Sequence, residues 1–369
     1  MRRISGMARV ATFLTLFALL LTACGSTTTG NNPGPGGSTP STQHISVALV
    51  TDIGGLNDGG FNQLSNEGYT KAQQQYGFKR DVIQTASQND YVQNLTTAAQ
   101  QADMVIAVGF LMQTPLDRVA KQFPTKKFAI VDGCAVPDPA KGDCENLPNV
   151  AQLFFKEQEA GCTVGAMAAQ MELDGKSKVP KLFGLAKKTI GAVGGLPIPP
   201  VDRYIAGYKF CAQKVAKDIN VVVSYSNDFT DPTKCKAAAD SQITDEHADI
   251  VFQVAGGCGI GVLDSATAKN VYSIGVDADQ SKDSSGKARP SVITSALKRV
   301  DTAVYDIIND AQNGQYAGFV ANPTKFDLAH DGVGFATPSS AVPQDAIAKA
   351  QDFANQIKTG TLVVPEKIP

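Results

Sequence analysis

The fold is decided by residues 45–63, which read Ile45-Ser46-Val47-Ala48-Leu49-Val50-Thr51-Asp52-Ile53-Gly54-Gly55-Leu56-Asn57-Asp58-Gly59-Gly60-Phe61-Asn62-Gln63. The apolar run at 45–50 predicts a buried strand, and the glycines after it predict a tight loop. Apolar residues with helical spacing follow at 60–76. A strand, a glycine-rich loop and a helix in this order form the first unit of an α/β fold.

The alternation continues along the chain in two series. In the first series we expect strands at 79–84, 104–108, 127–131 and 150–155, and helices at 90–101, 113–122 and 157–173. In the second we expect strands at 182–185 or 189–193, 221–225, 250–254, 271–276 and 291–294, and helices at 201–217, 232–246, 261–268 and 299–312. Strands that alternate with helices of this length predict parallel sheets with right-handed crossovers. The sequence therefore predicts two α/β lobes.

The N-terminus carries export signals. Arg2, Arg3 and Arg9 precede an apolar run at 10–21 that has the length of a signal-peptide core. The run ends in Leu21-Thr22-Ala23-Cys24, which resembles the bacterial lipobox, in which the cysteine is lipidated and becomes the first residue. We expect a signal peptide at 1–23 and a lipidated, flexible tether at 24–43, rich in Gly, Ser, Thr, Asn and Pro. The protein would then be anchored to the cell membrane and face the periplasm or the exterior. An ordinary secretory signal with an incidental cysteine is the alternative.

Composition excludes several classes of protein. The formal net charge is -2 and no basic stripe is present, which argues against a nucleic-acid partner. Residues 44–369 suffice for two domains of ordinary size. No later segment has the roughly 18 consecutive apolar residues of a membrane span.

Six cysteines remain beside Cys24, an even number that predicts disulfides in an exported chain. The pair Cys134–Cys144 brackets a short loop and is the first expected bridge. Cys211 and Cys235 lie near the facing ends of consecutive predicted helices and are the second, which leaves Cys162 with Cys258 by elimination. A zinc site is not expected, because CxxC spacing is absent and the chain has only three histidines.

Unusual loops follow the predicted strands, and ligands of open parallel sheets bind at the carboxyl ends of strands. In the first loop, Asp52, Asp58 and Asn62 offer polar groups, and Phe61 at the start of a helix is placed to cover a flat ring. Structural roles are the alternative, with Asp58 as a helix cap and Phe61 in the core. The loop lacks the phosphate-binding and dinucleotide-binding fingerprints. Its acidic residues favour a neutral ligand rich in hydroxyl groups.

Later strands end in a similar way. They lead into Asp132-Gly133, into Gly256-Gly257 and into Asp277. Each aspartate alone could be a simple cap. Several of them at the edge of one cleft indicate a binding site.

Several motifs, taken in order, resemble the basic membrane protein family of nucleoside-binding lipoproteins of ABC transporters, which includes a purine nucleoside receptor. These motifs are Asp52-x-Gly-x-x-x-Asp58-x-x-Phe61-Asn62-Gln63, Gly194-Gly195-x-x-x-Pro199-x-Val201-x-x-Tyr204-x-x-Gly207-Tyr208, Ile274-Gly275-Val276-Asp277-x-Asp279-Gln280 and Thr294-Ser295-x-x-Lys298. The resemblance runs from about residue 45 to 365, over nearly the whole folded part.

The resemblance implies a type I periplasmic-binding-protein fold, with two Rossmann-like lobes and a three-crossing hinge. Residues 44–153 and about 292–322 would form lobe 1, and about 154–291 and 323–369 lobe 2. The chain would be a monomer that serves an ABC permease and its ATPase, with no cofactor and no catalysis.

The resemblance also implies roles for individual residues. Phe61 and Tyr204 would sandwich the base, and Asn62 and Asp132 would hold its edges. Asp277, Lys298 and the backbone near Gly257 would hold the ribose, while Asp58 would contribute to either. Two positions depart from the family pattern, because Gly60 stands where Ser is common and Tyr204 where Phe is usual.

Three other functions compete with nucleoside transport. A sugar or another small polar solute would suit the same residue types. A receptor or adhesin would act through its surface. A nucleoside-processing enzyme would need a nucleophile with its base or a metal cluster, and His44, His247 and His330 are scattered.

Overall fold

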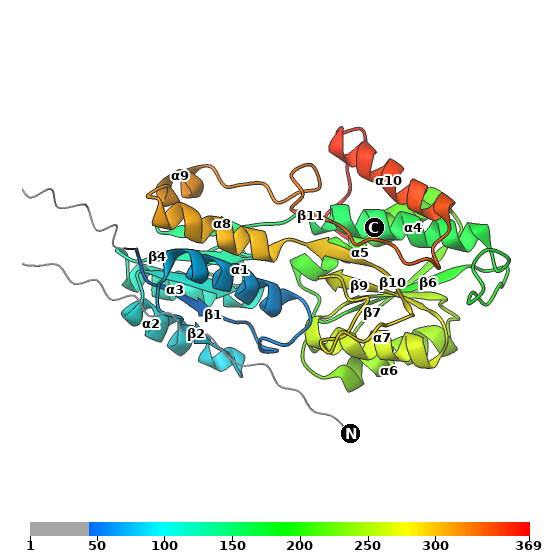
Figure 1. Cartoon of the computed structure of the whole chain (residues 1–369), viewed down its shortest axis with the longest axis horizontal. Coiled ribbons are helices and arrows are strands. Elements are labelled where there is room, and N and C mark those ends of the chain that lie inside the picture. Colours follow the sequence, from blue (N-terminus) through cyan, green and yellow to red (C-terminus); the bar gives the residue numbers. More distant parts are fainter. Residues whose placement is uncertain (1–43) are drawn as a thin grey trace, which may run out of the picture. The chain divides into compact units, whose positions relative to one another are not determined.

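The computed structural model describes residues 44–369, which form one compact unit. The unit is built from two parallel-stranded sheets, each flanked by helices (Figure 1). The expected signal peptide, the lipidation of Cys24 and the tether lie outside the described residues and stay predictions.

The first sheet has five strands in the order β2-β1-β3-β4-β5, all paired in parallel. Its strands are β1 (Val47–Val50), β2 (Val82–Ile83), β3 (Met104–Val108), β4 (Lys127–Val131) and β5 (Val150–Leu153). Its helices are α1 (Phe61–Tyr76), α2 (Tyr91–Gln101), α3 (Gln113–Gln122), α8 (Val300–Gln312) and α9 (Tyr316–Ala321), with short 3-10 turns at Gln88–Asp90 and Phe110–Met112. The central strands are apolar, apart from Lys127 at the start of β4, because helices cover both faces of the sheet.

The second sheet has six strands in the order β11-β10-β9-β8-β6-β7. Its strands are β6 (Thr189–Gly194), β7 (Asn220–Tyr225), β8 (Ile250–Val254), β9 (Tyr272–Asp277), β10 (Val292–Lys298) and the antiparallel edge strand β11 (Val333–Phe335). Its helices are α4 (Glu157–Asp174), α5 (Pro199–Val215), α6 (Pro232–Thr244), α7 (Ile260–Ala268) and α10 (Gln344–Lys358), with a 3-10 turn at Gly256–Gly259. Of the two segments considered for the first strand of this series, 189–193 is the one that forms a strand.

The chain passes between the two sheets three times: after β5, after β10 and between α9 and β11. The passages are tied together, since Phe155 forms a parallel bridge with Phe326 and the Arg299 N–H donates to the Gly332 carbonyl at 2.9 Å. This is the expected fold class, two α/β lobes on a three-crossing hinge.

One strand belongs to a different lobe from the one that the sequence predicted. Residues 292–298, placed in lobe 1 by the sequence, form β10 and pair with β9 and β11 in the second sheet. The return of the chain to the first sheet therefore begins with α8, whose Asn309 accepts a hydrogen bond from the Tyr76 hydroxyl of α1 at 2.6 Å.

The disulfides are Cys134–Cys144, Cys162–Cys211 and Cys235–Cys258. The first confirms the expectation, whereas the expected pairs Cys211–Cys235 and Cys162–Cys258 are wrong. The reason is the close packing of α4 on α5, where a Cβ atom on Gly161 would lie 2.1 Å from the Tyr204 carbonyl oxygen. That approach brings Cys162 and Cys211 together in a buried cluster. Cys235, near the start of α6, then pairs with Cys258.

Candidate functional site

The carboxyl ends of both sheets surround one cavity of about 640 Å³, part of it open to solvent. All nine residues that the sequence predicted for ligand binding line it: Asp52, Asp58, Phe61, Asn62, Asp132, Tyr204, Gly257, Asp277 and Lys298. Their contacts divide them into groups that shape the cavity and groups that still have unused hydrogen-bonding capacity.

Asp58 and Asn62 shape the first loop. The Asp58 carboxylate accepts hydrogen bonds from the backbone N–H groups of Gly60, Asn62 and Gln63 at 2.8 to 3.1 Å, so it caps the start of α1. The Asn62 side chain accepts from the Asp52 N–H at 2.9 Å and donates to the Ile53 carbonyl at 3.3 Å. The structural role considered for Asp58 is therefore present, and Asn62 keeps one N–H for a ligand.

Asp52 is a buried carboxylate in the lining of the cavity. Its carboxylate accepts from the Ile53 N–H at 2.7 Å and from the Tyr91 hydroxyl. Burial raises the pKa of Asp52 to about 6, against the opposing effect of the Tyr91 hydrogen bond.

Lys298, at the end of β10, is the centre of a buried charge network. Its ammonium group pairs with Asp132 and, at 2.8 Å, with Glu157 at the start of α4. Glu157 also accepts from Arg203 Nε at 2.6 Å. Because an ammonium group has three protons, Lys298 keeps one donor for a ligand. Glu157 was missed by the sequence analysis, since an acidic residue in the first turn of a helix is ordinary there.

Asp132 carries an unused acceptor. Its Oδ2 pairs with Lys298, whereas its buried Oδ1 has no hydrogen-bond partner within residues 44–369. Burial raises the pKa of Asp132 to about 6, despite the nearby Lys298 charge. A buried acceptor without a partner is costly, so this oxygen is suited to a donor group of a ligand.

Asp277 occupies the matching place in the second sheet. Asp132 and Asp277 both have left-handed backbone conformations, with φ of 64° and 62°, which turn the chain where β4 and β9 end. Asp277 Oδ1 accepts from the Tyr204 hydroxyl at 3.1 Å. Burial raises the pKa of Asp277 to about 7, with Lys298 acting in the opposite direction.

Tyr204 is more enclosed than a stacking ring requires. The side chain is 2% exposed, and its ring lies edge-on to Phe252 with 6.1 Å between centroids. Its hydroxyl group, which the Phe of the family pattern lacks, donates a hydrogen bond to Asp277.

Two further aromatic side chains line the cavity and were missed: Phe110, just after β3, and Phe229, after β7. Both follow strand ends, so the rule that identified Asp132 and Asp277 could have found them. The Phe229 ring fits only because residue 195 is glycine, since a Cβ atom there would lie 2.2 Å from the ring.

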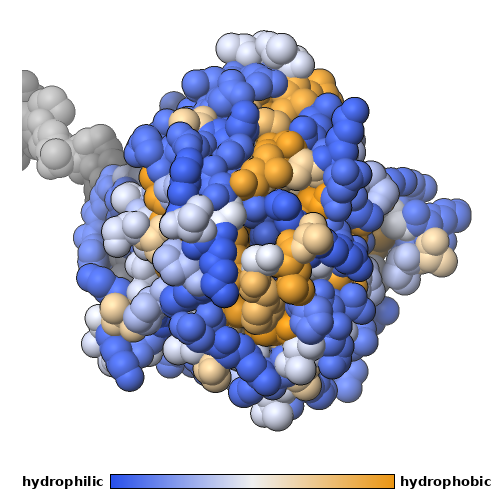
Figure 2. All heavy atoms as spheres, turned by 90° about the vertical axis from the view of Figure 1, so that its right-hand side faces the viewer, coloured by the Kyte–Doolittle hydropathy of each residue, from blue (hydrophilic) through white to orange (hydrophobic). Residues whose placement is uncertain are grey.

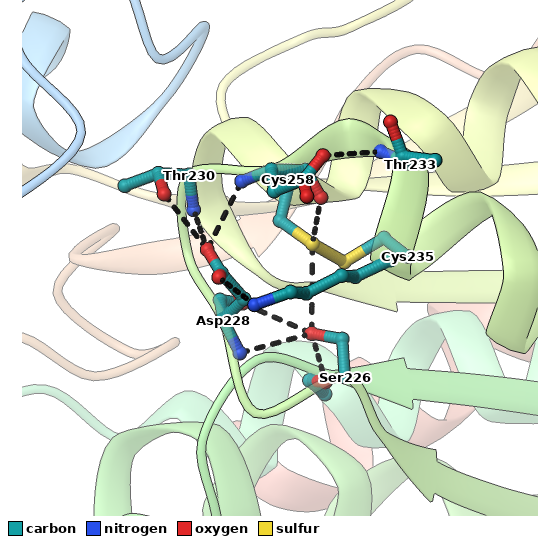
Figure 3. Close-up of polar contacts among 9 residues, drawn as sticks. Ser226, Asp228, Thr230, Thr233, Cys235 and Cys258 are labelled. Atoms are coloured by element: carbon teal, nitrogen blue, oxygen red, sulfur yellow. Dashed lines mark hydrogen bonds and ion pairs between the residues drawn. A yellow bond between two sulfur atoms is a disulfide. The ribbon is translucent and has the colours of Figure 1, made fainter.

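The loop that carries Phe229 is firmly held. The Asp228 carboxylate accepts from the Thr230 and Asp231 N–H groups and pairs with Lys234 at 2.7 Å, an interaction that lowers its pKa (Figure 3). The Cys258 N–H donates to the Phe229 carbonyl at 2.9 Å, and the Cys235–Cys258 disulfide fixes the same turn to α6. Gly256 and Gly257 on that turn also line the cavity.

Apart from the Lys298–Asp132 pair, which lies where β10 enters the hinge, one side-chain hydrogen bond joins the two lobes within the described residues. Gln280 Nε2 donates to the Gly59 carbonyl at 3.1 Å, and Gln280 Oε1 accepts from Gln253 Nε2 at 2.6 Å. Gln280 is 4% exposed, so this bond is shielded from water.

Replacing Gln280 with Ala should therefore shorten the life of the closed form. We expect a ligand dissociation rate about tenfold higher, because one hydrogen bond contributes about 1 kcal/mol net and its loss leaves the partly buried Gly59 carbonyl unpaired. Stopped-flow measurement of association and dissociation checks this. Asp279→Ala, at a neighbouring position, is the matched control. An unchanged dissociation rate in Gln280→Ala would show that the bond does not hold the lobes.

A cavity enclosed between the carboxyl ends of two parallel sheets on a three-crossing hinge defines a two-lobed solute-binding protein. Comparisons with known proteins agree. A family model described as ABC transporter substrate-binding protein PnrA-like (Bmp) matches residues 45–367, so the chain belongs to this family.

The relatives carry matching names. The chain is 31% identical over 375 residues to the CD4+ T-cell-stimulating antigen of Listeria innocua, with 95% of each chain covered. It is 30% identical over 343 residues to the ABC transporter nucleoside-binding protein BmpA of Lactococcus lactis, with 88% of this chain and 90% of the relative covered. A solute-binding protein of an ABC transporter system from Aeropyrum pernix K1 has a similar structure, with a TM-score of 0.72, 27% identity, and 87% of this chain and 94% of that one covered.

The chain is thus a substrate-binding protein of an ABC transporter, a class that binds small ligands and works with a membrane permease. Its relatives include lipoproteins, among them an uncharacterized lipoprotein of Pyrococcus furiosus. Within residues 44–369, no helix is long and apolar enough to cross a membrane.

Proposed function

We propose that the chain captures a nucleoside, in first place a purine nucleoside, and delivers it to the permease of an ABC importer from a lipid anchor on Cys24. One observation carries the proposal: aromatic rings line the same cavity as a buried carboxylate, Asp132, whose Oδ1 has no hydrogen-bond partner within residues 44–369. A nucleoside offers a flat base for the rings and hydroxyl and amino donors for the carboxylates. The name of the Lactococcus lactis relative supports this choice.

The base would stack on Phe61. Phe229 enters the cavity from the other lobe and competes with the largely enclosed Tyr204 for the second face. Stacking of a base on an aromatic side chain contributes about 1–3 kcal/mol. Closure of the lobes would bury both faces of the base.

The polar groups would fix the orientation of the ligand. Asp132 Oδ1 and the remaining N–H of Asn62 suit the base edge, whereas Asp277 and the third proton of Lys298 suit the ribose hydroxyls. A Cβ atom on Gly60 would lie 3.5 Å from Asp277 Oδ2, so the family's Ser would fit there and place a hydroxyl beside this oxygen. Its absence leaves that acceptor to the ligand.

Calorimetric titration tests the proposal. The chain, stripped of carried-over ligand by unfolding and refolding, is titrated with inosine, guanosine, adenosine, cytidine, ribose and a free base. We expect micromolar or tighter binding of at least one purine nucleoside, and a loss of about tenfold or more in Phe61→Ala. Phe154→Ala, an exposed phenylalanine outside the cavity, is the control. Heat with ribose alone, or with none of the ligands, would reject the nucleoside assignment.

The proposed role of Asp277 predicts a pH dependence. Its pKa is raised to about 7, and a carboxylate that accepts ribose hydroxyls must be ionised. Lowering the pH from 7.5 to 5.5 protonates Asp277 in the free protein and should weaken binding by about 25-fold. Titrations at several pH values check this. Asp277→Asn should bind the ligand more weakly at pH 7.5 and lose most of the pH dependence. If the pH dependence persists in this variant, the group that takes up the proton is Asp52 or Asp132.

A further inference from the structure

The segment at 175–188, which joins α4 to β6, has a composition unlike that of the surrounding surface. It contains Lys176, Lys178, Lys181, Lys187 and Lys188 and no acidic residue. In Figure 1 it is the green loop at the right-hand end of the molecule. Because it precedes β6, it lies at the amino edge of the second sheet, opposite the edge that carries the cavity.

Hydrophobic side chains are exposed on and beside this segment. Five large hydrophobic side chains of residues 44–369 are exposed, and three belong here: Leu173 (48%), Phe183 (38%) and Leu185 (47%). Figure 2, which views this end of the molecule, shows hydrophobic side chains gathered in a band between hydrophilic ones. An exposed apolar group within a basic surround is typical of an interaction site.

The segment is held in place by the fold. Val179 and Leu182 are buried beneath it. The Phe183 N–H donates to Asp249 at 2.6 Å, and its ring lies edge-on to His247 at 6.0 Å. The exposed hydrophobic side chains are therefore presented from a fixed base.

Most of the positive charge is unpaired. Lys178 pairs with Asp345 at 2.8 Å and with Asp174 at 3.7 Å. The other four lysines have no carboxylate within 4 Å among residues 44–369, and Lys181 instead lies over the Tyr272 ring. The segment thus has a net attraction for an anionic partner.

We propose that residues 175–188 bind the surface of an anionic phospholipid membrane, with Phe183 and Leu185 inserted among the headgroups and the lysines on lipid phosphates. Aromatic and aliphatic residues beside lysines are the combination that interfacial binding uses. A permease that receives the ligand must approach the carboxyl edges of the sheets, and this segment lies at the other edge. The surface goes beyond ligand capture and does not depend on which ligand the cavity takes.

Vesicle sedimentation tests the proposal. The chain from residue 24 onward, carrying Cys24→Ser so that no lipid is attached, is mixed with vesicles of phosphatidylcholine and phosphatidylglycerol in roughly equal parts, or of phosphatidylcholine alone. We expect binding to the anionic vesicles only, weakened by salt. Lys176→Gln and Lys187→Gln should each reduce the partition coefficient by about fivefold. Phe183→Ser with Leu185→Ser should reduce it at least tenfold.

Val363→Ser is the matched control, because Val363 is 80% exposed and lies outside the segment. It should leave vesicle binding unchanged, and thermal unfolding should show that all variants stay folded. Equal binding by wild type and Phe183→Ser with Leu185→Ser, or no binding to anionic vesicles, would overturn the proposal. The surface would instead belong to a protein partner if the chain did not bind vesicles but could be cross-linked to the permease, and if the same variants lost that cross-link. Ligand titration of each variant keeps this outcome separate from the proposed function.

Discussion

Replacing Lys298 with Met should lower the free energy of unfolding by about 3–5 kcal/mol and abolish ligand binding. Lys298 is 1% exposed and pairs with both Asp132 and Glu157. Methionine matches the length of the side chain but leaves two buried carboxyl groups without their common cation. Chemical denaturation followed by circular dichroism, with the disulfides intact, measures the loss.

Lys156→Met provides the matched control. Lys156 also lies in the hinge, where it pairs with Glu366 at 2.7 Å, but both side chains are about half exposed. An exposed pair contributes only about 0–1 kcal/mol, so this variant should be close to wild type. Adding Asp132→Asn and Glu157→Gln to Lys298→Met should recover part of the loss. If Lys298→Met alone were as stable as Lys156→Met, the network would not be the support that its geometry indicates.

Removing the Cys162–Cys211 disulfide by double substitution with Ala should cost about 4 kcal/mol. The bridge joins α4 to α5 across 49 residues, and chain-entropy arguments give longer loops the larger effect. The Cys134–Cys144 bridge spans 10 residues, so its removal should cost about 3 kcal/mol.

Thermal and denaturant unfolding of the two double variants measure both costs. Peptide mapping of the wild-type protein under non-reducing conditions checks the pairing independently. A peptide that joins Cys211 to Cys235 would contradict the structure, and an equal loss in the two variants would show that strain or packing outweighs loop length.

Much of the fold could be predicted because glycines and polar residues interrupt the sequence between its apolar runs. The strands β3, β4 and β8 begin and end where the sequence predicted, since each is a buried run with a glycine or an aspartate next to at least one of its ends. Residues 182–185 are apolar as well, but they belong to the basic loop, where Leu182 is buried and Phe183 and Leu185 are exposed. The sheet that receives β10 depends on pairing with β9, which local sequence does not encode.

The site could be predicted less completely. The strand-end rule found Asp132 and Asp277 because position in the sheet fixes where these residues lie. It could not show that Asn62 is partly used to hold its own loop or that Tyr204 bonds to Asp277. The disulfide error has the same origin, because spacing along the chain does not show which faces of α4 and α5 meet.

The hydrogen bond from Gln280 to Gly59 has a consequence for energy use. With so little direct bonding between the lobes outside the hinge, the closed form gains most of its stability from whatever it encloses. An empty molecule should then spend little time closed. A transporter that responds to the closed shape would rarely be triggered by unloaded molecules, and little ATP would be hydrolysed without cargo.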